Sequence, residues 1–193
     1  MDLKDKKLGF AMCGSFCTLK KAISALESVK ESGADIIPIM SEITYGTDTR
    51  FGKAIDLRDK ITSLTGKQII HTISEAEPIG PKKLLDALII LPCTGNTLAK
   101  LAYGIADTSV TMATKSHLRN NRPVIIAVST NDGLGAAAQN IGKLLARKNI
   151  YFIPFNQDAP FDKATSLVAD FNMAVPTVKA ALEGRQFQPI LVV

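Results

Sequence analysis

Three short polar segments contain the residue types that could bind a ligand. They are Gly14-Ser15-Phe16, Cys93–Asn96 and Ser129–Gly133, and each follows an apolar run. Hydroxyl groups and small residues dominate them, and ionisable side chains are scarce. Backbone N–H groups and hydroxyls of this kind suit a phosphate held at the start of a helix. We therefore predict a binding site for a phosphorylated, planar ligand.

The sequence offers little for hydrolytic or metal chemistry. It has no Ser/His/Asp set, no paired carboxylates and no metal-ligand cluster at a useful spacing, so no metal is expected and no catalytic residue is assigned. The first turn holds one glycine, Gly14, instead of the GxGxxG fingerprint, and no P-loop is present. On spacing alone, Gly14 and Ser15 could hold a phosphate or form a plain tight turn.

The three cysteines, Cys13, Cys17 and Cys93, fit neither a disulfide framework nor a zinc ribbon. Cys13 and Cys93 each follow a predicted strand closely, so they could be neighbours in one crevice. Two interpretations stay open. Either they are small buried residues that fit tight loops, which we favour, or they form a redox pair.

The element that must position these segments is the apolar run Ala87–Leu91. A continuous run of this kind is typical of a parallel strand covered on both faces. The polar turn after it leads into helical spacing at Leu98, Leu101, Ala102 and Ile105. Because loops at the carboxyl ends of parallel strands form the ligand crevice, we expect the site there.

Strand and helix patterns alternate along the rest of the chain. Strands are predicted at Lys7–Met12, Asp35–Met40, Val124–Val128 and Ile150–Ile153. Helices are predicted over Leu19–Leu26, Asp56–Leu64, Asp107–Asn120 and Leu134–Leu145. The predicted fold is a three-layer αβα arrangement, Rossmann- or flavodoxin-like, with a mainly parallel sheet of about five strands.

Other segments give weaker patterns. Ser41–Arg50 is predicted as a long polar loop, Gln68–Thr72 as a short strand with His71, and Pro81–Asp86 as a short helix. Residues 1–193 are predicted to form one domain with a helical and extended tail from about residue 160. The apolar end of that tail could dock on its own domain or in an oligomer interface.

Composition narrows the class of protein. Of the 193 residues, 46% are hydrophobic and 6% aromatic, and the net charge of +5 is scattered rather than gathered in a stripe. Aromatic side chains on which bases could stack are thus scarce, and we expect no nucleic-acid partner. No run approaches the roughly 20 apolar residues of a membrane span, and the start lacks a signal-peptide pattern. A cytoplasmic location without membrane contact is expected.

The run PCTGNTLAKLAYGIADT, Pro92–Thr108, resembles the P-A-S-A-N-T signature of the flavin-binding decarboxylase superfamily. The related flavin prenyltransferases continue it as GIADNLLTRA, which Asp107 and Thr111 match. The resemblance implies FMN as the cofactor. Joined with the polar turns above, it gives these cofactor-binding candidates: Gly14, Ser15, Phe16, Ser41, Thr94, Gly95, Asn96, Thr97, Thr111, Ser129 and Thr130.

Departures from that superfamily matter as much as the matches. The decarboxylase motif P-x-M-N is replaced here by Ala127–Asn131, and the prenyltransferase motif P-R-E-T keeps only Thr130. Met112 stands where the prenyltransferases have an arginine. A stand-alone FMN-dependent decarboxylase or flavin prenyltransferase is therefore an alternative rather than the preferred function.

The runs PVIIAVSTNDGLG and VPTVKAALEGRQFQP resemble one branch of the superfamily best. Such proteins are oxidoreductase subunits that act with a second subunit similar to nicotinamide-binding dehydrogenases, and they aromatise a small ring dicarboxylate during sporulation. The resemblance implies an FMN-binding redox subunit, NAD(P) supplied through the partner, and a homo-oligomer, a trimer or dodecamer. A non-catalytic partner subunit is the third hypothesis.

Overall fold

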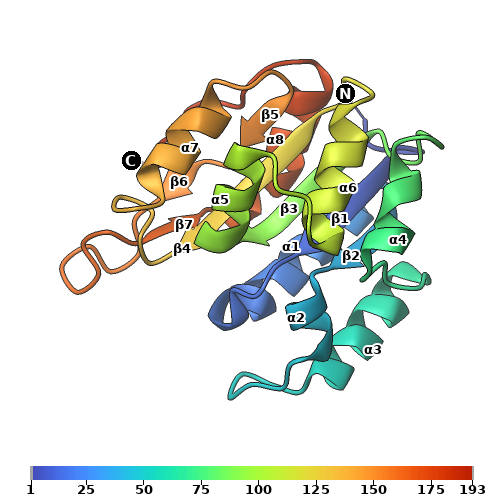
Figure 1. Ribbon diagram of the computed structural model, residues 1–193, viewed down its shortest axis with the longest axis horizontal. Helices are drawn as coiled ribbons and strands as arrows, with labels where there is room; N and C mark the ends of the chain where they lie inside the picture. Colours follow the sequence, from blue (N-terminus) through green and yellow to red (C-terminus); the bar gives the residue numbers. More distant parts are fainter. Residues whose placement is uncertain (1, 193) are drawn as a thin grey trace.

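A seven-stranded sheet forms the centre of the protein in a computed structural model, which describes residues 2–192 (Figure 1). Met1 and Val193, the last residue of the predicted tail, lie outside the described residues. Five strands run parallel in the order β2-β1-β3-β4-β5. They are β1 (Lys7–Met12), β2 (Asp35–Met40), β3 (Ala87–Cys93), β4 (Val124–Thr130) and β5 (Ile150–Phe152).

Two antiparallel strands extend this sheet at its far edge. The amino half of β4 pairs with β5, whereas its last residues, Ser129 and Thr130, pair with β7 (Leu167–Ala169). Strand β6 (Phe155–Asn156) then pairs with β7. The sheet is therefore mixed and mostly parallel, which confirms the predicted fold class.

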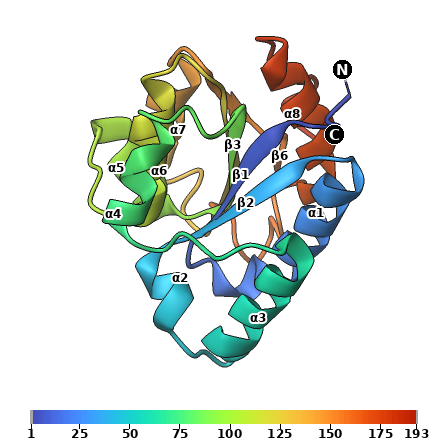
Figure 2. The ribbon, with the colours of Figure 1, turned by 90° about the vertical axis from the view of Figure 1, so that its right-hand side faces the viewer.

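Helices cover both faces of the sheet, as Figure 2 shows edge-on. One face carries α1 (Leu19–Glu31), α3 (Ala54–Thr65) and α8 (Ala174–Leu182). The other carries α4 (Ile73–Ala76), α5 (Gly95–Tyr103), α6 (Ser109–Leu118) and α7 (Ala138–Leu145). This three-layer arrangement follows from the parallel strands, since each crossover must pass over a face of the sheet.

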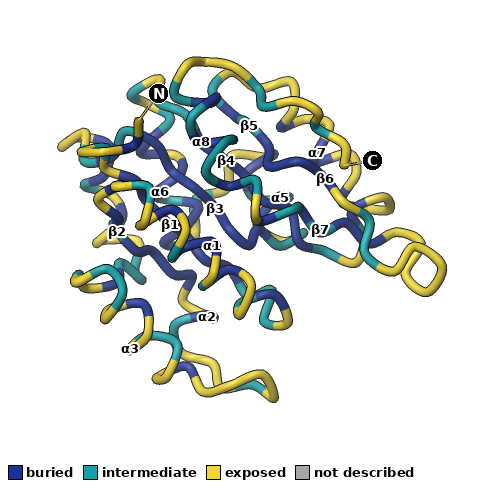
Figure 3. The backbone as a smooth tube through the Cα atoms, turned by 180° about the vertical axis from the view of Figure 1, so that it is seen from behind, coloured by how far each residue is buried: buried dark blue, intermediate teal, exposed yellow. Residues whose placement is uncertain are grey.

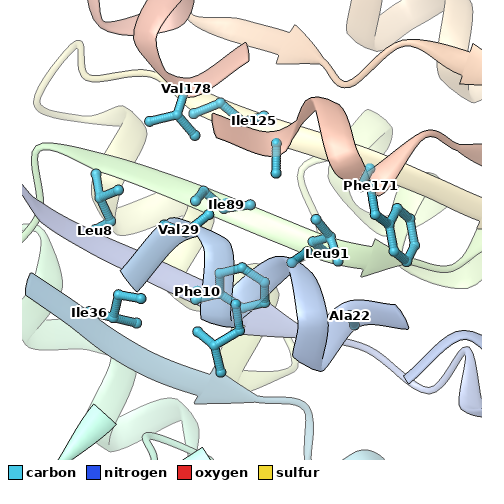
Figure 4. Close-up of a cluster of buried hydrophobic side chains, with 14 of the residues drawn as sticks. Leu8, Phe10, Ala22, Val29, Ile36, Ile89, Leu91, Ile125, Phe171 and Val178 are labelled. Carbon is cyan, nitrogen blue, oxygen red and sulfur yellow. The ribbon is translucent and has the colours of Figure 1, made fainter. Parts of the chain in front are cut away.

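Alternate side chains of the strands fill two separate cores. Phe10, Ile89 and Ile125 point toward α1 and α8, in the cluster drawn in Figure 4. Ala11 and Leu88 belong to the other cluster, beneath α5, α6 and α7. Every residue of β3 is buried, so the strands form the dark interior of Figure 3. The apolar run that predicted a central strand is confirmed.

Three local predictions were wrong. Residues 81–86 form turns, with Lys83 at φ +49°, and the short helices lie earlier, as α4 and the 3-10 helix η2 (Glu77–Ile79). The predicted polar loop after Ser41 contains α2 (Glu42–Gly46), because the Ser41 side chain caps it. The strand predicted at 68–72 shrinks to one bridge between Ile39 and Ile70.

The last part of the chain packs onto the sheet. Ala174, Val178 and Ala181 of α8 lie in the first core, and a 3-10 helix, η3 (Phe171–Met173), precedes them. Near the end, the Phe155 N–H donates to the Ile190 carbonyl at 2.7 Å. Leu191 stays 61% exposed beside this contact. Within residues 2–192, no helix combines the length and apolar character that a membrane crossing needs.

His117 is buried at the amino end of β4, on the side opposite the predicted site. Its Nε2 lies 3.1 Å from the Pro123 carbonyl, and its Nδ1 has no partner among the described residues. A neutral ring that donates through Nε2 fits these contacts. Burial lowers the pKa of His117 from 6.5 to about 4.

We expect this ring to destabilise the protein in mild acid. The folded pKa lies below the unfolded one, so the stabilising contribution is complete above pH 6.5 and is lost as the pH falls through 4. Between pH 7 and 4, the free energy of unfolding should fall by about 3 kcal/mol more in the natural chain than in His117→Gln. Urea titrations across this range measure it, and His71→Gln controls for the loss of a histidine. Parallel pH curves for the natural chain and His117→Gln would refute the expectation.

Candidate functional site

The strand order reverses between β1 and β3, and this reversal creates a crevice at the carboxyl edge of the sheet. Strand β1 leads to α1 on one face, whereas β3 leads to α5 on the other. In the order 2-1-3-4-5, ligands bind between the loops that follow these two strands, and the flavodoxins are the known example with FMN. The Cys13 N–H donates to the Pro92 carbonyl at 3.2 Å and holds the two loops together.

Hydroxyl groups link the loops after β1 and β4. Ser15 Oγ lies 2.9 Å from Ser129 Oγ, although β3 separates their strands. Thr18 Oγ1 lies 3.2 Å from Ser129 Oγ and donates to the Ser15 carbonyl at 2.9 Å. Sequence reasoning missed Thr18. Its only signal is its position three residues after Ser15, in the 3-10 helix η1 (Phe16–Thr18) that follows the turn.

The N-terminus of α5 faces the same edge. The Thr94 side chain caps it by accepting from the Thr97 N–H at 3.3 Å. Among the described residues, the backbone N–H groups of Gly95 and Asn96 have no acceptor, and neither do those of Gly14 and Phe16. Free N–H groups beside hydroxyls and a helix N-terminus favour an anionic or strongly polar ligand group.

Gly95 allows α5 to start against the β4 loop. A Cβ on Gly95 would lie 2.9 Å from Thr130 Oγ1 and 3.0 Å from Asp132 Oδ1. Thr130 donates its hydroxyl hydrogen to Asp132. The first turn of α5 and the end of β4 are thus in direct contact, without an intervening side chain from Gly95.

The structure brings most of the predicted cofactor residues to this edge. The contacts of Ser15 with Ser129, of Cys13 with Thr97 (Oγ1 to Sγ, 3.3 Å) and of Gly95 with Thr130 join three loops. The residues on these loops are Gly14, Ser15, Phe16, Thr94, Gly95, Asn96, Thr97, Ser129 and Thr130. Asn96 is exposed, and its side chain is therefore accessible to a ligand.

The side chains of Ser41 and Thr111 form their hydrogen bonds within their own segments rather than with this group. Ser41 follows β2, and its N–H donates to the Met12 carbonyl at 3.0 Å, but its buried hydroxyl bonds Thr44 Oγ1 at 2.8 Å. Thr111 lies in the first turn of α6, where its side chain bonds Thr108 in a capping box. We find no hydrogen bond between Thr111 and the crevice loops within the described residues.

The cysteine pair is buried below the crevice. Burial raises the pKa of Cys13 to about 11, despite the Thr97 hydrogen bond, and burial also raises the pKa of Cys93. Both thiols therefore stay protonated near neutral pH, which makes them poor nucleophiles. These environments favour the structural interpretation over the redox pair. No group of three or more His, Cys, Asp or Glu that could hold a metal occurs in residues 2–192.

A cavity of about 420 Å³ opens beside Phe16, between the start of α1 and the α2–α3 segment. Its lining includes the apolar side chains of Leu19, Ile23, Phe51 and Leu57 and the cationic side chains of Lys20, Lys53 and Lys60. Lys60 pairs with Glu27 at 3.0 Å. Sequence reasoning identified Phe16 and the loop from Tyr45 to Phe51, which could contact a substrate, but it missed the lysines. They lie on α1 and at α3 and show no spacing pattern along the chain.

Next to this cavity, aromatic stacking fixes α2. The rings of Tyr45 and His71 lie 3.7 Å apart with 9° between their planes, and the Arg58 guanidinium lies 4.5 Å from the Tyr45 ring centre. His71 Nδ1 also lies 3.3 Å from Glu75 Oε2. The stack joins three segments that sequence alone left separate.

Comparison with known proteins defines the class. The chain belongs to the Flavoprotein family, whose sequence profile matches residues 1–182. Within it, the chain is 44% identical to the B subunit of dipicolinate synthase of Bacillus subtilis (strain 168), over 98% of this chain and 95% of the relative. The crystal structure of the corresponding dipicolinate synthase protein from Bacillus halodurans superposes with a TM-score of 0.92 at 42% identity, covering 100% of this chain and 99% of the other.

A more distant structure shares the fold. The FMN-dependent cysteine decarboxylase SpaF superposes with a TM-score of 0.65 at 22% identity, over 94% of this chain and 97% of its own. The family match and the similarity to the two dipicolinate synthase proteins confirm the resemblance that the sequence suggested.

We expect the Ser15 and Ser129 hydroxyls to be energetically coupled. In a double-mutant cycle of Ser15→Ala and Ser129→Ala, the coupling energy should be about 0.5–1.5 kcal/mol, since each single variant removes the same partly buried hydrogen bond. Chemical denaturation without added FMN measures it. The exposed Ser24→Ala, combined with Ser129→Ala, should give additive effects. Additivity of the Ser15 and Ser129 substitutions would show that the bond contributes nothing.

Proposed function

We propose that this chain is the FMN-binding B subunit of a dipicolinate synthase. It acts with an A subunit to oxidise dihydrodipicolinate, or its hydroxytetrahydro precursor, to dipicolinate. The observation that carries the proposal is the crevice between the β1 and β3 loops, with its free N–H groups and the Ser15–Ser129 hydroxyl pair. Membership in the Flavoprotein family supports a flavin there.

The donor set of the crevice fits FMN. The Ser15, Thr18 and Ser129 hydroxyls and the N–H groups of Gly14 and Phe16 would hold its phosphate and ribityl oxygens. Thr94, Gly95, Asn96 and Thr97 at the start of α5 would bind its ring system. Bound FMN supplies a two-electron acceptor, which aromatisation of a dihydropyridine ring requires.

The precursor is a small ring dicarboxylate, and we assign it to the 420 Å³ cavity beside Phe16. The lining holds three lysines and one acidic residue, Asp56. Among the described residues, Lys20 and Lys53 form no ion pair, so they can bind carboxylates. Phe16 belongs both to this cavity and to the crevice loop. It would therefore bring the precursor next to the cofactor loop, and the lining would shield the ring from water.

The subunit name of the relatives implies a partner, which we propose is an A subunit that binds NAD(P). We further propose a homo-oligomer, a trimer or dodecamer. Ile43, Phe51 and Leu134, which follow β2 and β4, are 61%, 54% and 53% exposed, and apolar side chains at this level of exposure suit contacts between subunits. The proposed location is the cytoplasm of the mother cell in a sporulating bacterium.

FMN retention is the first expected result. After incubation with FMN and removal of free ligand, the protein should keep about one FMN per chain, seen in the flavin absorbance bands. Ser15→Ala with Asn96→Ala should weaken FMN binding at least about tenfold, because hydrogen bonds to a charged phosphate are strong. Ser24→Ala is the matched control. A colourless natural protein would overturn the FMN-binding role and favour a non-catalytic partner subunit.

Dipicolinate formation tests the reaction. With an A subunit, NAD(P) and the precursor, the purified chain should produce dipicolinate, measured by chromatography, and its omission should abolish the product. Lys53→Gln should raise the KM for the precursor several-fold by removing one carboxylate contact, whereas the exposed Lys21→Gln should not. Equal product without this chain would refute the proposal. Turnover of peptidyl-cysteine or dimethylallyl phosphate by the chain alone would favour the decarboxylase or prenyltransferase alternative.

A further inference from the structure

A second cleft, of about 390 Å³, lies between α5 and α6 and shares no lining residue with the cavity beside Phe16. Figure 1 shows these two helices side by side near the middle of the view. Its volume falls in the range of sites for small molecules. The function proposed above makes no use of it.

The charges around this cleft are all positive. Lys115, Arg119 and Arg147 line it, and its lining contains no acidic residue. Neither Lys115 nor Arg119 forms an ion pair within residues 2–192. They lie four positions apart, Lys115 in the last turn of α6 and Arg119 at its C-cap, and like charges at this spacing repel. An anion between them would relieve this repulsion.

Arg147 is the fixed member of the three. Its guanidinium donates to the carbonyls of Leu101 and Ala102, both at 3.1 Å, at the C-terminal end of α5. These bonds satisfy carbonyl groups that a helix end leaves free, and they hold the guanidinium in place. Two of its five N–H donors are used there, so others remain for a ligand.

The rest of the lining is apolar or already bonded. Leu101, Ile105 and Leu118 contribute apolar surface, and Ile105 is 48% exposed. The two threonine hydroxyls are engaged in their own helix, since Thr111 bonds Thr108 and Thr114 donates to the Val110 carbonyl at 2.8 Å. Recognition must therefore combine the three cations with contact to an apolar surface.

We propose that this cleft binds a small organic anion, a carboxylate or phosphate ester with an apolar body. The anionic group lies between Arg147, Lys115 and Arg119, and the body lies on Leu101, Ile105 and Leu118. The inference does not depend on the FMN site, because the cleft and the crevice loops share none of the bonded groups described above.

Calorimetric titration of the full-length protein with 2-naphthoate tests the proposal, as purified and with added FMN. The Lys115→Gln/Arg119→Gln variant should bind 2-naphthoate at least about tenfold more weakly, a change of about 1.4 kcal/mol. The control, Lys21→Gln/Lys148→Gln, removes the same charge from exposed positions outside both cavities and should bind like the natural chain. Both variants should retain FMN as the natural chain does, so failure of the FMN proposal would be seen separately.

Two further ligands separate the contribution of the negative charge from that of the apolar body. Neutral 2-naphthylmethanol and inorganic phosphate should each bind much more weakly than 2-naphthoate, because each lacks one half of the recognised chemistry. Equal binding of 2-naphthoate by the charge-removal variant and its control would overturn the proposal. Loss of self-association in the Lys115→Gln/Arg119→Gln variant, with unchanged naphthoate binding, would do so as well, and would identify this surface as a protein contact instead.

Discussion

Complete burial of β3 is the constraint on which the rest of the structure depends. None of its seven residues is exposed, so both faces of the sheet must be covered. The neighbouring strands run parallel to β3, and the crossover connections between parallel strands provide that cover. The chain meets this demand by placing α1 and α8 on one side and α5, α6 and α7 on the other. The change of side between β1 and β3 is what opens the crevice. The site is thus a consequence of how the core is closed.

The crevice is built from hydroxyls, amides and glycines rather than from charged side chains. Ser15, Thr18 and Ser129 bond one another across the end of β3, and this network holds the segment after β1 against the end of β4. Such a site can position a bound group accurately, because its donors are fixed by strands and by a helix start. It supplies few acids or bases of its own. The proposed function accordingly assigns the redox chemistry to a bound flavin and to a partner subunit rather than to side chains of this crevice.

Charge is placed elsewhere on the molecule. The cavity beside Phe16 has lysines at its lining, and the cleft between α5 and α6 has three cations around an apolar floor. The neutral donors of the crevice and the two groups of cations thus lie in separate places on the molecule. The net charge of +5 shows no stripe along the sequence. The cations gather into these two groups only when the helices pack.

The sequence by itself determined the layers, the parallel strands and the loops of the site. A strand that is buried on both faces needs a continuous apolar run, such as Ala87–Leu91, and this run is visible in the sequence. Small polar residues after each strand indicate the edge of the sheet where ligands bind. It also determined the family, through the Pro92–Thr108 motif. Tertiary structure decided what depends on contacts between distant segments: the Ser15–Ser129 bond, the contact of Thr18 with Ser129, and the cationic cleft. These contacts join residues up to 114 positions apart, and no local pattern encodes such pairings. The misplaced helix at 81–86 has a local cause instead. Pro81 gave a start signal there, whereas the capping box of Thr72 and Glu75 begins the helix earlier.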